Sequence, residues 1–383
     1  MRERGPVLKI VHLVSSLETG GTEMMVYKLL RSSETDRAQS SVVSLTSGGV
    51  IAERIRALGV VVVSLDMRRG FPNPLALLRL VLLLRRQRPA VLQTWLYHSD
   101  LLGLIAGKLA GVPAVAWNIR CSTTDERYFT GLTGRVVRIL AKYSSKPAAV
   151  VVNSEAGRTI HKAMGYRPRR WEVIPNGFDL GAYLPDPDAY TDVREELGIA
   201  RGTPIVGLVA RFDPLKDHAT FLSASGLLHA TRAGAHFVLV GWQVDRDNPI
   251  LVDQIDRLGI RENVHLLGER QDIARLTAAF DVATCSSTGE GFPNIVGEAM
   301  ACAVPVVSTD VGDAKLVVGE TGIIVPPSDP GALAAGWRTI LDMDPHARRE
   351  LGSQARARIS SHFDIDRIAK QYGALYRDLS NQK

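Results

Sequence analysis

Short apolar runs that alternate with segments of helical spacing constrain the fold of this chain more than any other sequence feature. Six runs of strand length fall in the first half: Leu8–Val14, Ser41–Leu45, Val60–Leu65, Ala90–Trp95, Ala114–Asn118 and Ala149–Asn153. Helical spacing fills intervals such as Glu23–Leu30, Pro74–Arg88 and Asp100–Leu109. The runs are nearly continuous in hydrophobicity, as expected for parallel strands covered on both faces. The sequence therefore predicts an open α/β sheet.

The pattern resumes after an irregular stretch in the middle of the chain. Residues 178–203 are polar, place Pro185 and Pro187 beside acidic residues, and indicate a linker. Further strands are predicted at Pro204–Arg211, His236–Val240, Val264–Leu267, Val282–Cys285, Pro305–Ser308 and Gly322–Val325, and the chain is helical from Gly331 on. A chain of 383 residues exceeds the usual size of one core. We therefore predict two α/β domains joined near residue 180.

Composition indicates an ordinary globular protein, with 45% apolar and 22% charged residues. The most apolar stretch, Leu75–Leu84, is interrupted by Arg79 and is too short to cross a bilayer. The N-terminus lacks the apolar core of a signal peptide. The three cysteines, Cys121, Cys285 and Cys302, have neither disulfide nor zinc spacing. These features favour a cytoplasmic location.

Charge is distributed unevenly along the chain. Residues 1–180 hold 26 Lys and Arg against 13 Asp and Glu, a net charge of +13, whereas the remainder carries −7. The basic half indicates an anionic partner, such as a membrane surface or a phosphate-bearing acceptor, or else a solvated basic face. The leucine-rich segment Pro74–Arg88 carries four arginines, so it is either a sheet-covering helix with cations at its C-terminal end or a helix that lies on an anionic membrane. Together with the charge of the whole half, it favours peripheral membrane contact; nothing indicates nucleic acid.

A glycine pair marks the end of the first predicted strand. Leu8–Val14 leads through a short polar loop to Gly20 and Gly21, and a helix follows. Paired glycines let a backbone approach a ligand closely, and a helix N-terminus favours anions. A tight turn without ligand contact is the alternative. It lacks the G-x-G-x-x-G spacing of dinucleotide-binding proteins, which argues against a nicotinamide-dependent oxidoreductase.

The most informative segment is residues 286–301, which follows the strand Val282–Cys285 and opens a helix near Pro293. Glu290 and Glu298 bracket a loop whose free amides suit phosphate, while the carboxylates can accept hydrogen bonds from sugar and ribose hydroxyls. Phe292 is an apolar residue in a polar loop and is interpreted as a packing residue rather than a sugar platform.

Two cations follow the strand Pro204–Arg211. Arg211 and Lys216 lie five residues apart, and such a pair is often plain surface charge. In a doubly wound sheet, however, this loop shares a crevice with the loop of Glu290. The two cations can then clamp a diphosphate and stabilise it as a leaving group.

The order of these motifs resembles glycosyltransferase family 4, a family of retaining enzymes with the GT-B fold. The similarity rests on Arg211 and Lys216, Gly241 after a strand, and Glu290-Gly291-Phe292-Pro293-Asn294 with Glu298, and the Gly20-Gly21 pair supports it. It implies two Rossmann-like domains with parallel sheets facing across a cleft. Residues 1–180 would bind the acceptor, with a C-terminal helix of about 366–383 packing back on them, and residues 181–365 would bind the donor.

The resemblance also implies a role for each matching residue. Arg211 and Lys216 would bind the donor diphosphate, Glu290 would hold sugar hydroxyls, and Glu298 would hold the ribose. The remaining donor-binding residues would be Gly241, Arg270, Gly291, Phe292, Pro293 and Asn294, with Gly20 and Gly21 approaching the phosphate from the other domain. His98 falls where the family places a histidine near the reacting sugar, although a lone histidine at a strand–helix junction is often structural.

Two positions depart from the family pattern. Ala303 stands where a glycine usually ends the helix that starts at Asn294, which implies a different cap or mild strain. The segment Asp313-Ala314-Lys315 lacks the glutamate often seen there, so no contact can be transferred to it.

The expected reaction is transfer of a sugar from a UDP- or GDP-sugar to a hydroxyl of a glycan or lipid-linked acceptor, in polysaccharide or glycolipid synthesis. The donor phosphate would leave and deprotonate the incoming hydroxyl on the same face, with no cofactor and no metal. The triplets Asp186-Pro187-Asp188 and Asp364-Ile365-Asp366 are poorly placed for a metal-bound diphosphate. A sugar-nucleotide epimerase and a non-catalytic nucleotide-sugar binder are the alternatives.

Overall fold

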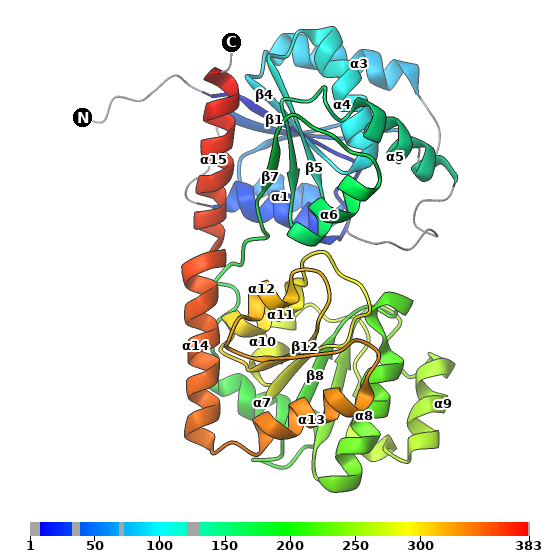
Figure 1. Cartoon of the computed structure of the whole chain (residues 1–383), viewed down its shortest axis with the longest axis vertical. Coiled ribbons are helices and arrows are strands. Elements are labelled where there is room, and N and C mark those ends of the chain that lie inside the picture. The colour runs from blue at the N-terminus through cyan, green and yellow to red at the C-terminus, as the bar shows by residue number, and fades with distance from the viewer. Residues whose placement is uncertain (1–7, 33–38, 69–72, 121–130, 382–383) are drawn as a thin grey trace, which may run out of the picture. The chain divides into compact units, whose positions relative to one another are not determined.

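The structure is a computed structural model that describes residues 8–32, 39–68, 73–120 and 131–381 (Figure 1). Contacts divide the chain into two compact units. The N-terminal unit contains residues 1–177 and 365–383, and the C-terminal unit contains residues 178–364. Cys121 lies outside the described residues, whereas Cys285 and Cys302 are buried and unpaired.

The N-terminal unit is built on a parallel sheet of seven strands in the order β3-β2-β1-β4-β5-β6-β7. The strands are β1 (Ile10–Val14), β2 (Ser40–Ser44), β3 (Val61–Ser64), β4 (Val91–Trp95), β5 (Ala114–Ile119), β6 (Ala149–Val152) and β7 (Trp171–Val173). The first six match the predicted runs. The edge strand β7 was not predicted, because three residues are too few to form a recognisable hydrophobic run.

Helices cover both faces of this sheet (Figure 1). They are α1 (Gly21–Arg31), α2 (Val50–Ala57), α3 (Pro74–Gln87), α4 (Tyr97–Ala110), α5 (Gly131–Tyr143), α6 (Glu155–Ala163) and α15 (Ile365–Asn381). Side chains alternate across each strand, so Ile10 and Val14 pack with α1, α2 and α15, whereas Val11 and Leu13 pack with α3, α4 and α5.

The last helix returns to the N-terminal unit. Ile368, Tyr372 and Leu375 of α15 are buried in its core. Polar contacts fix the helix at both ends, because Ser32 Oγ donates to Asp366 at 2.6 Å and Arg170 forms an ion pair with Asp378. Residues 365–383 are thus structurally part of the unit formed by the beginning of the chain.

The C-terminal unit contains a parallel sheet of six strands in the order β10-β9-β8-β11-β12-β13. The strands are β8 (Ile205–Val209), β9 (His236–Val240), β10 (Val264–Leu266), β11 (Val282–Cys285), β12 (Val306–Thr309) and β13 (Ile323–Val325). The helices are α7 (Pro187–Leu197), α8 (His218–Thr231), α9 (Pro249–Leu258), α10 (Ile273–Ala278), α11 (Asn294–Ala301), α12 (Ala314–Val318), α13 (Pro330–Leu341) and α14 (Pro345–Phe363), with 3₁₀ turns η3 (Pro214–Lys216) and η4 (Arg261–Asn263). All six predicted strands are present.

The interpretation of residues 178–203 as a linker is wrong. Helix α7 occupies Pro187–Leu197, and its N-cap Asp186 accepts hydrogen bonds from the amides of residues 188 and 189. Arg194 of α7 is buried and forms an ion pair with Asp281 at 2.5 Å. The polar composition reflects the exposed face of this helix, and the Asp-Pro start signal was read as irregular structure.

Ala303 adopts the left-handed backbone conformation for which the family pattern usually has a glycine at this position. Helix α11 ends at Ala301, and Ala303 has φ +57°, in the left-handed region. An alanine pays about 1 kcal/mol or more in this region. The predicted strain is therefore present, at the residue directly after the cap.

The two units differ in charge more strongly than the sequence halves do. The N-terminal unit holds 30 Lys and Arg against 14 Asp and Glu, a net charge of +16, and the C-terminal unit holds 16 against 26, a net charge of −10. Among the described residues, no helix is both long and apolar enough to span a membrane.

Candidate active site

The strand order of the C-terminal unit places two loops side by side. Strands β8 and β11 are hydrogen-bonded neighbours at the point where the order reverses. Loops that leave the carboxyl ends of such strands diverge to opposite sides and leave a crevice for ligands. Arg211 and Lys216 follow β8, and Glu290 follows β11.

The loop after β8 is held by a capped 3₁₀ turn. Asp213 caps η3 by accepting a hydrogen bond from the amide of Leu215 at 3.0 Å, and its other carboxylate oxygen accepts from Arg211 at 2.8 Å. Asp217 then takes a left-handed conformation and caps α8. The local sequence thus turns the chain sharply and directs it into the helix. Arg211 remains more than half exposed.

The loop after β11 docks on this turn. The amide of Thr288 donates to the carbonyl of Leu215 at 2.9 Å, and Ser286 Oγ donates to the carbonyl of Lys216 at 2.8 Å. These bonds bring the Lys216 ammonium group to 2.5 Å from Glu290 Oε1, which also accepts from Ser287 Oγ at 2.7 Å. The structure therefore brings together two predicted site residues that come from different loops.

Charge and burial set the ionisation of this pair. Lys216 is 25% exposed and Glu290 is 14% exposed. Burial alone would lower the pKa of Lys216, but the Glu290 carboxylate outweighs it and raises the pKa. Lys216 therefore stays protonated over the whole physiological range and offers a fixed cation to a phosphate.

Helix α11 begins directly beyond Glu290. Pro293 is the N-cap and Asn294 is the first helical residue, so the first-turn amides point toward the loop of Gly291. Phe292 is 5% exposed and packs against Phe178 and Phe363, with ring centroids 6.1 and 5.8 Å away. Phe292 thus anchors the loop in the hydrophobic core, as a packing residue does.

Two residues that the sequence did not single out also shape the loop. Ser287 Oγ donates a hydrogen bond to Glu290, and the Ser287 carbonyl accepts one from Thr309 Oγ1 at 2.6 Å. Gly312, with φ +55°, lies so close that a Cβ there would stand 2.4 Å from the carbonyl oxygen of Gly291. The β12–α12 loop therefore supports the loop of Glu290, and only a spatial argument could have revealed it.

Glu298 lies in the second turn of α11, eight residues after Glu290. It hydrogen-bonds the hydroxyl of Tyr183, and burial together with the charge of Glu298 raises the pKa of that tyrosine. The carboxylate is partly buried. It therefore occupies a defined position rather than a freely solvated one.

Gly241 follows β9 and lies next to the loop after β8, whereas Arg270 follows the edge strand β10. A Cβ at Gly241 would stand 2.2 Å from the carbonyl oxygen of Ala210, so its lack of a side chain lets the ends of β8 and β9 meet. Arg270 is engaged by Asp272 and Glu196, at 2.8 and 2.7 Å, in a network that also includes Arg275. In this structure both residues have structural contacts.

The remaining predicted residues belong to the N-terminal unit, at its own strand-order reversal between β1 and β4. Gly20 is the N-cap of α1, and Gly21 is its first residue. His98 lies in the first turn of α4, where partial burial lowers its pKa. The hydroxyls of Ser15 and Ser99 form a hydrogen bond at 3.0 Å, which connects the loop after β1 to the first turn of α4.

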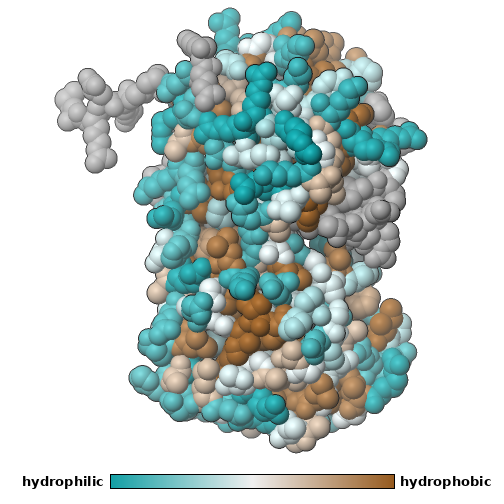
Figure 2. All heavy atoms as spheres, in the orientation of Figure 1, coloured by the Kyte–Doolittle hydropathy of each residue, from teal (hydrophilic) through white to brown (hydrophobic). Residues whose placement is uncertain are grey.

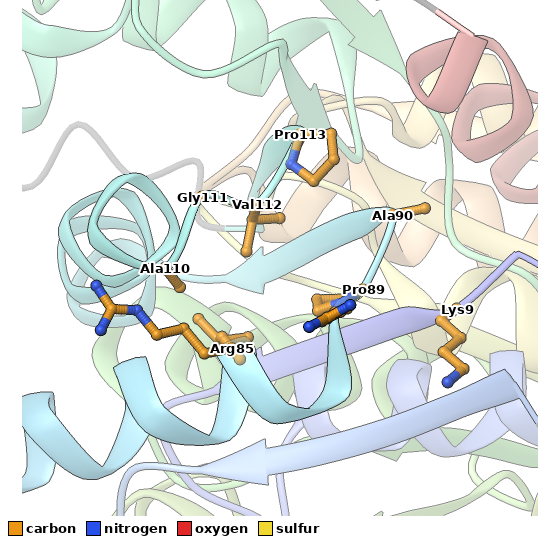
Figure 3. Close-up of a pocket in the computed structure, with 10 residues that line it drawn as sticks. Lys9, Arg85, Pro89, Ala90, Ala110, Gly111, Val112 and Pro113 are labelled. Carbon is orange, nitrogen blue, oxygen red and sulfur yellow. The ribbon is translucent and has the colours of Figure 1, made fainter.

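A cavity of about 790 Å³ also lies in the N-terminal unit, at the opposite edge of the sheet (Figure 3). Lys9, Arg85 and Arg88 line it, together with residues that precede β4 and β5. It is therefore separate from the loops of Gly20 and His98, which leave the carboxyl ends of the strands.

The Asp-x-Asp triplets have structural positions. Asp186 caps α7, and Asp364 pairs with Phe178 in an isolated bridge at the end of α14. Within the described residues, no group of three or more His, Cys, Asp or Glu side chains is arranged to hold a metal ion.

Comparison with known proteins identifies the family. Residues 203–343 match the family described as glycosyl transferases group 1, and residues 19–182 match glycosyltransferase family 4. The chain belongs to glycosyltransferase family 4, a family of retaining glycosyltransferases.

Individual relatives agree with this assignment. EpsF of Bacillus subtilis (strain 168) is 27% identical over 329 residues, which cover 81% of each chain. The Escherichia coli UDP-Gal:alpha-D-GlcNAc-diphosphoundecaprenol alpha-1,3-galactosyltransferase is 25% identical over 79% of each chain. HepE of Anabaena, solved in complex with UDP, superposes with a TM-score of 0.85 at 24% identity over 97% of this chain and all of HepE. This last similarity confirms the predicted GT-B fold.

Proposed function

We propose that this glycosyltransferase moves a sugar from a UDP- or GDP-sugar to a hydroxyl of a glycan or lipid-linked acceptor, with retention of configuration. The observation that carries the proposal is the Lys216–Glu290 pair, held at 2.5 Å where the strand order of the C-terminal unit reverses. A cation for phosphate and a carboxylate for hydroxyls stand together there, next to the N-terminus of α11.

Each residue of the pair has a separate task in the proposal. Lys216 and the exposed Arg211 bind the diphosphate and stabilise the charge that develops on it as the sugar leaves. Glu290 accepts hydrogen bonds from sugar hydroxyls. The same loop continues through Gly291, Phe292, Pro293 and Asn294. Its backbone contacts sugar and phosphate, and every residue of the four except the proline supplies an N–H donor.

The other assignments follow from position. We assign Glu298, fixed by Tyr183, to the ribose hydroxyls, and Arg270 to the region of the nucleotide base. Arg270 would have to share its contacts with Glu196 and Asp272 to do so. Gly241 keeps the strand ends close enough for a ligand to approach the backbone. Gly20, Gly21 and His98 are the contributions of the N-terminal unit.

The chemistry we propose is substitution on one face of the sugar. The bond between the anomeric carbon and the phosphate oxygen breaks, and the acceptor oxygen forms its new bond on the same face. The departing phosphate oxygen takes the proton of the acceptor hydroxyl, so no protein base is needed. The protein then acts by positioning and by electrostatic stabilisation.

Relatives indicate the class of acceptor. The Escherichia coli relative acts on a sugar linked to diphosphoundecaprenol, and a 30% identical relative from Geodermatophilus obscurus, of which the match covers 51%, glycosylates D-inositol 3-phosphate. Both named acceptors carry phosphate. We therefore propose a role in cell-envelope polysaccharide or glycolipid synthesis with a phosphate-bearing acceptor.

One layer of the N-terminal unit supports peripheral membrane contact. Of the fifteen large hydrophobic side chains exposed in the described chain, eight belong to helices α3, α4 and α5: Leu75, Leu78, Leu82, Ile105, Leu109, Leu132, Ile139 and Tyr143. Figure 2 shows apolar surface interspersed with hydrophilic side chains at the end of the molecule where Figure 1 draws α3.

The charge on these helices is of one sign. They expose seven cations, namely Arg79, Arg85, Arg86, Lys108, Arg135, Arg138 and Lys142. Their single acidic residue, Asp100, is fully buried. A surface that combines exposed leucines with cations suits an anionic bilayer, where each cation contributes about 1 kcal/mol of attraction. We propose that this layer docks on the cytoplasmic face of a membrane.

A donor panel tests the enzymatic proposal. UDP-, GDP- and ADP-sugars are compared by thermal shift and by release of free nucleotide, with Lys216→Ala and Glu290→Ala in parallel. We expect one nucleotide sugar to stabilise the wild type and to be turned over slowly, and both variants to lose these properties. Donor binding without release of nucleotide in the presence of any acceptor would favour a non-catalytic binder, and epimerised donor without transfer would favour an epimerase.

Vesicle flotation tests the membrane proposal. We expect binding to vesicles that contain phosphatidylglycerol and not to pure phosphatidylcholine, and loss of binding when Leu75, Leu78 and Leu82 are replaced by serine. Ile250→Ser is the control, because Ile250 is equally exposed, at 62%, on the C-terminal unit. Equal flotation of the triple variant and the wild type would contradict this surface.

A further inference from the structure

Arg120 stands at the carboxyl edge of the N-terminal sheet, directly after β5. Its guanidinium donates to Asn176 Oδ1 and, at 3.4 Å, to the hydroxyl of Tyr372. The guanidinium carbon also lies 5.5 Å from the ring centroid of Trp95. Strand β5 neighbours β4, so Arg120 lies next to the strand-order reversal where doubly wound sheets bind ligands.

No carboxylate forms an ion pair with Arg120 among the described residues. Its hydrogen-bond acceptors are an amide oxygen and a phenol, and Glu23 contributes only a longer-range attraction. Burial lowers the pKa of Arg120, which reports the cost of enclosing this charge. The buried Arg194 of the other unit differs, since Asp281 neutralises it at 2.5 Å. Arg120 is partly exposed, so an anion can reach it, and a largely buried cation with neutral partners is stabilised by such an anion.

Further polar groups near Arg120 lack partners. Asn153 Nδ2 donates to the same Asn176 oxygen at 3.4 Å, but Asn153 Oδ1 is buried with no hydrogen bond, as is Asn118 Oδ1. Buried acceptors of this kind are normally satisfied by water or by a ligand. The surroundings of the Arg120 guanidinium are therefore polar, with acceptor atoms that the described residues leave unused.

A purely structural role for Arg120, the attachment of α15, does not require its positive charge. Tyr372, which anchors α15, already accepts a shorter hydrogen bond from Asn118 Nδ2, at 2.8 Å. The aromatic rings of Trp95 and Tyr372 also pack together, with centroids 6.0 Å apart. Attachment of the helix therefore does not require a cation at this place.

We propose that Arg120 binds an oxyanion carried by the acceptor, a phosphoryl group or a carboxylate. The planar guanidinium has donors left beyond the bonds to Asn176 and Tyr372, and its fork geometry fits two oxygens of one anion. The inference rests on the proposed transferase function and specifies its acceptor class. It assigns recognition of the acceptor's charge to the N-terminal unit.

A matched set of probes tests the assignment in the full-length protein. Geranyl phosphate, geranic acid and geraniol share one chain and differ in the head group, and their binding is followed by tryptophan fluorescence, since Trp95 adjoins Arg120. Saturating UDP is present in one series to block the donor site and omitted in a second. The variants are Arg120→Met and Arg120→Lys, with Arg158→Met as a control that removes one exposed cation from the same unit.

We expect the wild type to bind at least one of the two anions about tenfold or more tightly than geraniol, with geranyl phosphate favoured if the oxyanion is a phosphoryl group. Arg120→Met should abolish the difference, Arg120→Lys should retain part of it, and Arg158→Met should retain it fully. Equal binding of the anions and geraniol by the wild type, or unchanged anion binding by Arg120→Met, would overturn the proposal. If Arg120→Met fails to fold, the decision passes to Arg120→Lys, which must bind the anion more weakly than the wild type. Failure of both UDP and GDP to bind, each tested in the same way, would appear separately and would count against the donor site instead.

Discussion

The Nζ atom of Lys216 donates a hydrogen bond to Oε1 of Glu290 across 2.5 Å, and the two residues are 74 positions apart in the chain. The contact pairs a cation with a carboxylate inside the candidate site. We propose that a diphosphate bound to Lys216 competes with Glu290 for the ammonium donors, which frees carboxylate oxygens to accept hydrogen bonds from the sugar. Phosphate and sugar recognition are thereby coupled through one pair of side chains.

Lys216→Met removes the cation while keeping the length of the side chain. We expect kcat/KM for the nucleotide sugar to fall about 10²- to 10³-fold, because a preorganised donor to the leaving group is lost. The pair is mostly buried, so loss of the cation should also lower the free energy of unfolding, by about 1–3 kcal/mol. Nucleotide release and urea unfolding measure the two effects. Lys315→Met, an exposed lysine of α12, should leave both near the wild type.

Gly312→Ala tests the support of the Glu290 loop by the neighbouring loop. The added Cβ would stand 2.4 Å from the carbonyl oxygen of Gly291, at a residue with φ +55°, so the loop must move. We expect a raised KM for the donor and a loss of stability of about 2 kcal/mol. Gly198→Ala is the control, because Gly198 also has a positive φ, but a Cβ added there would meet no atom within 4 Å. It should cost about 1 kcal/mol and leave KM unchanged; equal effects of both variants would contradict a contact-specific role.

The positions of the strands along the chain could be predicted from sequence because hydrophobic runs carry the signal of a buried parallel sheet. The runs at His236–Val240 and Val282–Cys285 coincide with β9 and β11 residue for residue. Helix α7 was missed for the opposite reason, since only a narrow face that includes Ala189 and Val193 is buried. Three-residue strands such as β7 carry too little pattern to be recognised.

The residues of the candidate site likewise fall into those that the sequence could predict and those that it could not. Motif spacing singled out Glu290 and Lys216, because strand ends in a doubly wound sheet converge. Spacing could not reveal Ser287 or Gly312, whose contributions depend on atoms of other loops. It also could not show that Arg270 is held by Glu196, which lies on the helix that was read as a linker.

Ala303→Gly should stabilise the protein. Ala303 has φ +57°, and glycine removes the steric cost of about 1–2 kcal/mol of an L-residue in the left-handed region. The greater freedom of glycine in the unfolded chain returns about 0.4–1 kcal/mol. We therefore expect a net gain of up to about 1 kcal/mol in the free energy of unfolding, measured with urea. Ala299→Gly, inside α11, is the counterpart and should destabilise by about 1 kcal/mol or more; a loss in both variants would argue against strain at Ala303.

The stability of the N-terminal unit should fall in mild acid because of His12. This residue is 1% exposed beneath α15, its Nδ1 accepts a hydrogen bond from the indole of Trp95 at 3.3 Å, and burial lowers its pKa from 6.5 to about 4. Between those pH values His12 becomes protonated in the unfolded chain but stays neutral in the folded protein. The stabilisation from neutral His12 is thus complete above about pH 6.5 and declines as the pH falls toward 4, by up to about 3 kcal/mol.

His12→Gln removes the titrating ring from this buried position. Its unfolding free energy should be lower than that of the wild type at pH 7, and the gap should narrow as the pH falls toward 4, because the variant lacks the proton uptake of His12. Urea unfolding at several pH values measures the gap. His346→Gln alters an exposed histidine of α14 and should reproduce the wild-type pH dependence. A gap between His12→Gln and the wild type that stays constant with pH would mean that His12 does not carry the acid sensitivity of this core.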